Sequence, residues 1–334
     1  MAAFVLRRLG FLVVVVLAVT VITFLIAQAI PGDPARVVAG PRADAQQLAK
    51  ARHQLGLDRP LPVRYADYLG RVLHGDLGAS IVTGRPVLSE LAARAPATLE
   101  LMISALIVGV AGGVPLGVAA ALTRGRWPDR LIRAGSALTI SVPAFWLGPL
   151  LILVFYGALQ VLPGSGRLDL DPPPPVTGFL LIDTLLAGDV AAFGDALAHL
   201  AIPVLTLALL DVGAIARLVR GQMIEVLGED YIRTARATGL SEATVILRYA
   251  LRNGLTPLVT VLGLSIAQML YGSVVIESIF AWPGDGSYVV GAIFNLDFPV
   301  VLGFALVTSV AYVVVNLGVD LTYLLLDPRI REAG

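Results

Sequence analysis

Carboxylic acids within or beside long apolar stretches are the side chains of this sequence best suited to act inside a membrane. Asp211, Glu277 and Asp320 occupy such positions. A charge inside a bilayer is costly, so it usually faces a water-filled cavity or a partner group. For Asp211 two roles are equally compatible with the sequence: lining a translocation path, or being buried with a hydrogen-bond partner. For Glu277 the sequence favours a role as a loop anchor beside the turn at 282–284 over a role in transport. For Asp320 it favours an ion pair with an arginine near the cytoplasmic face. Asp211 and Glu277 are nevertheless the two candidates for a path.

Several other classes of site are excluded or unsupported. The chain has no cysteine, which excludes disulfides, thiolate metal sites and cysteine nucleophiles. Its three histidines, His53, His74 and His199, are too few and too far apart in the sequence to indicate a metal cluster. The sequence therefore predicts no metal site, no catalytic residue and no cofactor held by this chain. A net charge of zero gives no support for nucleic-acid binding.

A membrane location follows from composition. Hydrophobic residues make up 57% of the 334 residues and charged residues 14%, against about 25% charged in soluble domains. Continuous apolar stretches, each close to the roughly 20 residues that span a bilayer as a helix, predict an all-α integral membrane protein with six transmembrane helices. The first stretch is too long for a signal peptide, whose apolar region has about 7–15 residues. The stretches are 9–30, 99–122, 131–160, 198–219, 255–276 and 300–326.

The expected organisation has three parts. Residues 1–30 form the first transmembrane helix, and the proline-rich, charged segment 31–95 forms an external module. Residues 96–334 form a five-helix core that includes a cytoplasmic loop at 228–247. Pro143, Pro149 and Pro203 lie inside apolar stretches and predict kinks rather than breaks.

The loops between these stretches alternate in charge. The 123–133 loop contains four arginines and one aspartate, and the 217–253 segment contains six arginines and four acids. The 160–197 loop contains five aspartates and one arginine, and the 277–299 loop contains three acids and no basic residue. Because positive loops stay in the cytoplasm, both termini are expected on the cytoplasmic side.

The longest cytoplasmic loop has the pattern of two short helices separated by a glycine. Glu229 and Asp230 suit the first turn of a helix, where the helix dipole favours acids. Gly239 suits the left-handed position after a helix, and Ser241 suits the cap of the next one. Such a helix, presented between two membrane helices, is shaped to meet a partner. The alternative is an amphipathic connector that lies on lipid headgroups.

This loop resembles the coupling loop by which importer permeases dock an ATP-binding subunit. The stretch 230–237 and the following Gly239-Leu240-Ser241-Glu242 are similar to the version found in the dipeptide/oligopeptide/nickel ABC importer family. The general Glu-Ala-Ala motif falls on Arg233-Thr234-Ala235, where only the second alanine is kept. Further similarities lie at Pro31-Gly32-Asp33-Pro34, Leu55-Gly56-Leu57-Asp58-Arg59-Pro60-Leu61-Pro62, Gly75-Asp76-Leu77-Gly78, Thr98-Leu99-Glu100-Leu101, Phe280-Ala281-Trp282-Pro283-Gly284, Asn316-Leu317, Asp320 and Asp327-Pro328-Arg329-Ile330-Arg331.

The resemblance implies the first of two permease subunits, of the type I importer kind, in the bacterial inner membrane. It implies a second homologous permease, two ATPase subunits that bind ATP and magnesium, and a solute-binding protein that touches the 31–95 module. It leaves dipeptides, longer peptides, nickel complexes and glutathione open as substrates. No nucleotide-binding G-x-x-x-x-G-K-[ST] segment is present, in agreement with ATP bound by another chain. The alternatives are a secondary transporter and an intramembrane hydrolase. The residues that the resemblance assigns to ATPase coupling are Glu229, Asp230, Tyr231, Arg233, Ala235, Arg236, Gly239 and Leu240.

Overall fold

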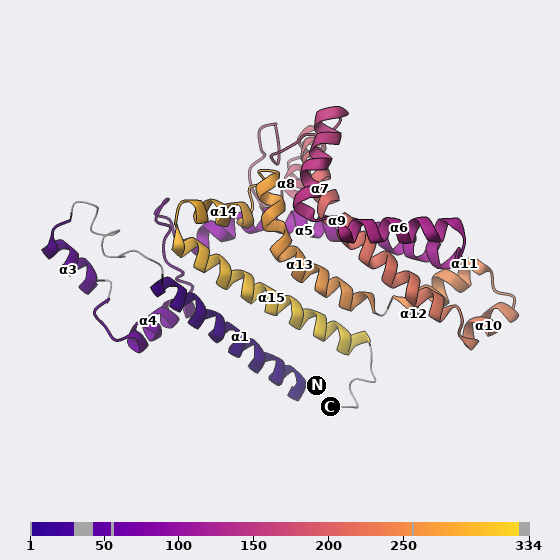
Figure 1. Cartoon of the computed structure of the whole chain (residues 1–334), viewed down its shortest axis with the longest axis horizontal. Helices are drawn as coiled ribbons and strands as arrows, with labels where there is room; N and C mark the ends of the chain where they lie inside the picture. Colours follow the sequence, from indigo (N-terminus) through magenta and orange to yellow (C-terminus); the bar gives the residue numbers. More distant parts are fainter. Residues whose placement is uncertain (1, 30–42, 55–56, 256, 327–334) are drawn as a thin grey trace. The chain divides into compact units, whose positions relative to one another are not determined.

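The computed structural model describes residues 2–29, 43–54, 57–255 and 257–326, and within these ranges the chain is almost entirely helical (Figure 1). Extended pairing among the described residues is limited to a single bridge between Ala79 and Pro86. The segments 31–34 and 327–331, which contributed to the resemblance, lie outside the described residues. The helices are α1 (Ala2–Ala29), α3 (Ala45–Gln54), α4 (Leu61–Leu73), α5 (Val87–Leu122), α6 (Trp127–Ser141), α7 (Ala144–Leu151), η1 (Ile152–Ala158), α8 (Leu180–Leu186), α9 (Val190–Val226), α10 (Asp230–Ala237), α11 (Glu242–Thr244), η2 (Val245–Ala250), α12 (Leu251–Gly254), α13 (Leu258–Ile279), α14 (Asp285–Phe294) and α15 (Phe298–Leu326).

The predicted all-α membrane architecture is confirmed. Four helices in the described part of the chain are long and apolar enough to cross a bilayer: α5, α9, α13 and the 298–319 part of α15. The pair α6 and α7–η1 gives a fifth candidate if it forms one broken span. α1 contains a shorter apolar helical stretch, Gly10–Ile26. These helices are consistent with the six predicted spans.

The expectation of a kink at Pro143 was wrong, because the helix breaks there. α6 ends at Ser141 and α7 begins at Ala144. Val142 has an extended backbone (φ −93°, ψ 121°), the conformation that the ring of a following proline favours. By contrast, Pro149 lies inside α7 and Pro203 inside α9, and α9 continues past its proline for more than twenty residues.

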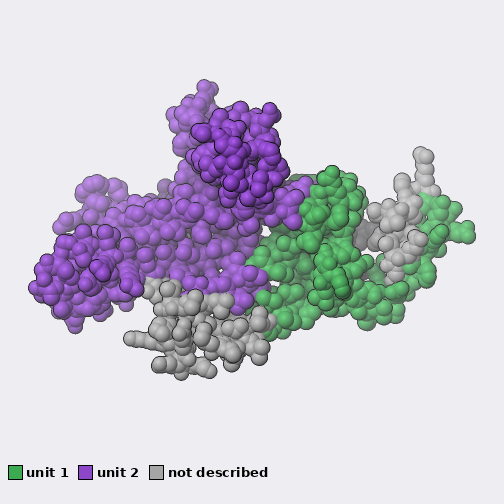
Figure 2. All heavy atoms as spheres, turned by 180° about the vertical axis from the view of Figure 1, so that it is seen from behind, with its two compact units in different colours: residues 1–91, 292–311 green, residues 92–291, 312–334 purple. Residues whose placement is uncertain are grey.

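The chain divides into two compact units, coloured separately in Figure 2. The first unit comprises residues 1–91 and 292–311. Within it, Tyr65 and Tyr68 of α4 pack on Phe24 of α1, with ring centroids 5.4 and 5.7 Å from that of Phe24. Their hydroxyls lie 2.9 and 3.1 Å from those of Thr20 and Thr23 respectively. Part of the 31–95 module is therefore fastened to the first apolar helix by its own aromatic side chains.

The second unit, residues 92–291 and 312–334, is built around α9. Small residues allow α5 to approach α9 closely, as Gly-x-x-x-Gly spacing does in other membrane helices. A Cβ on Gly117 would lie 2.7 Å from the carbonyl oxygen of Ala216, and one on Gly113 would lie 2.7 Å from the Cβ of Ile215. Neither position accepts a larger residue without moving a backbone. The two glycines therefore set the distance between these helices.

Candidate functional site

The loop at 228–247, which is expected to dock an ATPase subunit, folds as a helix, a glycine and a second helix. Glu229 is the N-cap residue of α10, and Asp230 lies in its first turn. Gly239 follows the helix with φ +82°, in the left-handed region. Ser241 then caps α11, its hydroxyl accepting a hydrogen bond from the backbone N–H of Thr244. The local signals read from the sequence thus correspond to the observed turns.

One face of α10 anchors the loop to the core. Ile232 is fully buried and Ala235 is 7% exposed. Both belong to a hydrophobic cluster that includes Val219 and Met223 of α9 and Val245 of η2. Burial of a side chain such as isoleucine contributes about 1.5–3 kcal/mol. The position of α10 is therefore tied to the end of a membrane-spanning helix.

The opposite face of α10 is polar and open. The side chains of Asp230 and Arg233 are 92% and 77% exposed and lie 3.3 Å apart. Tyr231 is 39% exposed, and its hydroxyl accepts a hydrogen bond of 3.0 Å from Asn253. The exposed face of α10 is therefore accessible to a partner, while the buried face fixes its position.

Arg236 has a different role from Arg233. Its guanidinium makes two hydrogen bonds to the carboxylate of Glu242, at 2.8 and 3.3 Å. This pair joins α10 to α11 across the turn at Gly239. Leu240, within the turn, is 38% exposed. The resemblance assigns both arginines to ATPase coupling. Arg233 pairs within its own helix, with Asp230, whereas Arg236 pairs with a residue of α11.

Asp211 lies in α9 and is 7% exposed. Its carboxylate accepts a hydrogen bond of 2.5 Å from the hydroxyl of Ser265 in α13. On its other side it packs against α5, where a Cβ on Gly109 would lie 3.1 Å from the Cβ of Asp211. The acid therefore sits where three spanning helices meet.

Glu277, at the end of α13, organises the turn that follows. Its carboxylate accepts hydrogen bonds from the hydroxyl of Thr98 at 2.7 Å and from the backbone N–H of Ser287 at 3.0 Å. The second bond caps the N-terminus of α14. A Cβ on Gly284 would lie 2.5 Å from a carboxylate oxygen of Glu277, which explains the glycine after Trp282-Pro283. This geometry is that of a loop anchor.

Asp285 follows directly and lies outside the spanning helices. Its backbone N–H donates to Thr98 at 2.9 Å. The pKa of Asp285 is raised to about 7, chiefly by burial and also by the charge of Glu277, while Arg94 acts in the opposite direction. Asp320, the remaining acid singled out from the sequence, lies in α15, and its side chain is outside the described residues.

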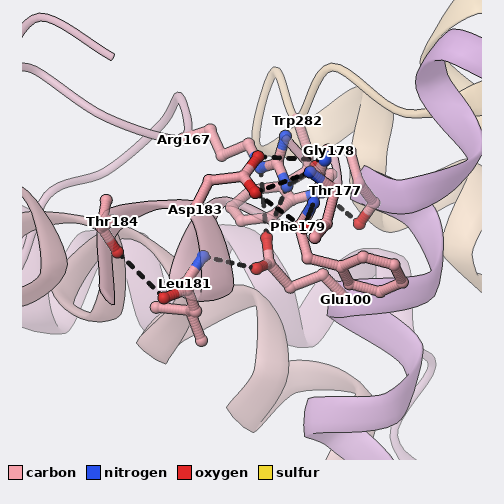
Figure 3. Close-up of polar contacts among 10 residues, drawn as sticks. Glu100, Arg167, Thr177, Gly178, Phe179, Leu181, Asp183, Thr184 and Trp282 are labelled. Atoms are coloured by element: carbon pink, nitrogen blue, oxygen red, sulfur yellow. Dashed lines mark hydrogen bonds and ion pairs between the residues drawn. The ribbon is translucent and has the colours of Figure 1, made fainter. Parts of the chain in front are cut away.

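Residues to which the sequence analysis gave no role hold the 160–186 segment to α5. Arg167 forms an ion pair of 2.6 Å with the buried carboxylate of Glu100, and donates a second bond of 3.0 Å to the carbonyl of Gly178 (Figure 3). The other oxygen of Glu100 accepts a bond of 2.8 Å from the N–H of Leu181. The Arg167 guanidinium also lies 5.6 Å from the centre of the Trp282 ring.

The acid of α8 completes this network. Asp183 accepts hydrogen bonds from the N–H and hydroxyl of Thr177, at 2.8 and 2.7 Å, and from the N–H of Gly178 at 2.9 Å (Figure 3). Burial alone would raise the pKa of Asp183, but these hydrogen bonds lower it below its ordinary value. The segment 160–186, which contains the run Pro172–Pro175, is thus held by two buried carboxylates.

Comparison with known proteins assigns both parts of the chain. Residues 113–332 match the model of the binding-protein-dependent transport system inner membrane component, and residues 1–102 match that of the N-terminal part of such membrane components. Over 98% of this chain, and 97% of the relative, 55% of residues are identical to the probable D,D-dipeptide transport system permease protein DdpB of Escherichia coli K12.

Two other relatives also align over nearly their whole length. The di/tripeptide transport system permease protein DppB of Pseudomonas aeruginosa is 45% identical, with 99% of each chain covered. The glutathione transport system permease protein GsiC of Salmonella typhimurium is 41% identical, again with 99% of each chain covered.

Proposed function

Because the chain belongs to the family of binding-protein-dependent transport system inner membrane components, we propose that it is the permease of an ATP-driven importer of short peptides. Dipeptides are the substrate class that we favour, since two of the three relatives described above carry dipeptides or di- and tripeptides in their names. The chain forms the translocation path together with a second, homologous permease. A solute-binding protein delivers the peptide, and the 31–95 module lies on the side from which it approaches.

ATP and its magnesium ion are bound by two ATPase subunits, one of which docks on this chain at residues 228–247. The observation that carries this proposal is the two-sided character of α10. Ile232 is buried beside the end of α9, while the side chain of Arg233 on the next position is 77% exposed. A push on the exposed face is therefore transmitted to a membrane-spanning helix, which is the requirement for a two-state shift driven by a partner.

The chain's lack of cysteine allows a direct test. A single cysteine at Arg233 (Arg233→Cys), in the assembled complex, should form a cross-link with an ATPase subunit when it is labelled with a benzophenone maleimide and irradiated. Arg64→Cys, in α4 of the other unit, serves as the control and should not. A cross-link of Arg64→Cys but not of Arg233→Cys to the ATPase would contradict the assignment of the docking surface.

The same complex tests function. Arg233→Glu should lower peptide-stimulated ATP hydrolysis and peptide uptake together, because a reversed charge on the exposed face opposes docking. The two permeases should still co-purify, since Arg233 lies outside the hydrophobic cluster that anchors the loop. Unchanged stimulation in Arg233→Glu would move the docking surface elsewhere. Uptake of labelled dipeptides by the reconstituted complex tests the substrate class independently.

A further inference from the structure

A buried histidine with an unused ring nitrogen lies where α9 begins. The side chain of His199 is 1% exposed. Its Nδ1 lies 3.0 Å from the backbone oxygen of Asp195, one turn earlier in the helix. A carbonyl oxygen only accepts, so Nδ1 is the donor in this bond. In the neutral ring, Nε2 then carries the lone pair, and it has no hydrogen-bond partner among the residues that the structure describes.

The lone pair of Nε2 faces negative charge. An oxygen of Asp169, whose side chain is 81% exposed, lies 3.4 Å from it. An oxygen of Asp195 lies 3.3 Å from Nδ1. The other oxygen of Asp195 accepts hydrogen bonds from the N–H groups of Asp169 and Leu170, at 2.8 and 3.3 Å, which hold the two aspartates together. An unprotonated nitrogen opposite a carboxylate is repulsive unless a cation lies between them.

We propose that His199, Asp169 and Asp195 form a binding site for a divalent transition-metal ion, with zinc as the expected occupant. One ligand atom from each of the three residues can be chosen so that all lie within 4.8 Å of one another. Zinc bonds of about 2.0–2.2 Å in tetrahedral geometry separate neighbouring ligands by about 3.4 Å. The observed 3.4 Å between Nε2 and the Asp169 oxygen equals that separation, whereas it is long for a hydrogen bond from a protonated ring.

The chemistry of the donors agrees with this assignment. One imidazole and two carboxylates suit zinc and its neighbours in the transition series better than magnesium or calcium, which prefer oxygen ligands alone. The bond from Nδ1 to the Asp195 carbonyl is the orienting contact that metal-bound histidines commonly have. Three protein ligands leave one position for water. The ion would fasten the 164–171 segment to the beginning of α9.

The sequence contained a weak signal for this site. Asp195 and His199 are four residues apart, which places them on one face of a helix. Asp169 comes from a loop, so the third ligand could not be identified from spacing. The three histidines by themselves, few and far apart in the sequence, therefore do not indicate this site.

Zinc counting on the purified importer complex tests the proposal. Any polyhistidine tag is removed, the complex is dialysed against a chelator, zinc is added, and unbound zinc is removed by gel filtration. The wild type should retain a zinc equivalent that Asp169→Asn and His199→Ala lack or bind more than about 100-fold more weakly. His53→Ala is the matched control, because His53 also lies near an aspartate, Asp58 at 3.6 Å, but is 89% exposed.

The two variants keep the outcome interpretable. His199 is buried, so its replacement could impair folding, whereas Asp169 is exposed and Asp169→Asn removes only the charge of one ligand. Reduced zinc in Asp169→Asn, with His53→Ala equal to the wild type, supports the site. Equal zinc in the wild type and Asp169→Asn overturns it. A wild-type complex without this zinc also overturns it.

Discussion

Arg236 and Glu242 form a two-bond ion pair that closes the turn of the coupling loop, with donor–acceptor distances of 2.8 and 3.3 Å. The pair spans Gly239, whose left-handed backbone reverses the chain between α10 and α11. The orientation of α10 thus depends on one glycine and one surface ion pair. Exposed ion pairs contribute about 0.2–1 kcal/mol, so the glycine has the larger effect.

Gly239→Val should uncouple ATP hydrolysis from transport. A Cβ at this position meets no atom of the described residues within 4 Å, so its cost comes from the backbone. That cost is about 1–2 kcal/mol for ordinary residues. Asparagine tolerates the left-handed region, so Gly239→Asn is the matched control and should keep stimulated hydrolysis. Equal activities of the valine and asparagine variants would show that the backbone conformation at this position does not matter for coupling.

Asp211→Asn should slow uptake while the complex assembles normally, if the carboxylate binds a cationic group of the substrate such as a peptide's amino terminus. A hydrogen bond to a charged group contributes about 1.5–3 kcal/mol, so the KM for uptake should rise at least about tenfold. Ser265→Ala removes the hydrogen bond to Asp211 and leaves its charge. Unchanged uptake in Asp211→Asn, with a similar loss of thermal stability in both variants, would give Asp211 a structural role.

Single cysteines test the orientation in intact cells, because the chain has none of its own. Val176→Cys, at a position 72% exposed in the acidic 160–197 loop, should react with a membrane-impermeant maleimide. Arg126→Cys, in the arginine-rich 123–133 loop, should react only after the membrane is opened. The opposite pattern at either position would contradict a six-helix topology with cytoplasmic termini.

Asp285 should make the stability of the complex depend on pH. Its pKa is raised from 3.8 to about 7 in the folded protein, so the folded state binds a proton that the unfolded chain releases over this range. Stability should therefore fall as pH rises from about 4 to 7, and change little from this group above that. Asp285→Asn should flatten this part of the profile of melting temperature against pH.

The control for that measurement is Asp171→Asn, which removes an equal charge at an exposed position. Its profile should follow that of the wild type. A profile of Asp285→Asn that keeps the wild-type slope would assign the pH dependence to another group.

Features set by neighbouring residues were predictable from the sequence. The acids at the beginning of α10, the glycine after it and the serine cap of α11 each act through the backbone within a few residues. The hydropathy of the spanning helices was equally clear. Their helical type follows from composition because the bilayer requires internally bonded backbones.

Features that depend on distant residues were not predictable. Glu100 and Arg167 are 67 positions apart, and only the fold brings the acid of α5 to the arginine of the loop. The break at Pro143 was also missed, because prolines in membrane helices produce kinks at some positions and breaks at others. Pro203 lies within a continuous helix, and the composition around the two prolines does not distinguish them.

The length of α9 has a mechanical consequence. Its 37 residues run without interruption from Val190 to Val226, with His199 in the first part and Met223, beside α10, in the last turns. At 1.5 Å per residue the whole helix is about 55 Å long. A helix of this length acts as a lever, because a tilt of a few degrees at one end displaces the other by several ångströms. Small movements of α10 would thereby become large ones at the far end of α9. A constraint placed near His199 would in turn restrict the movement of α10.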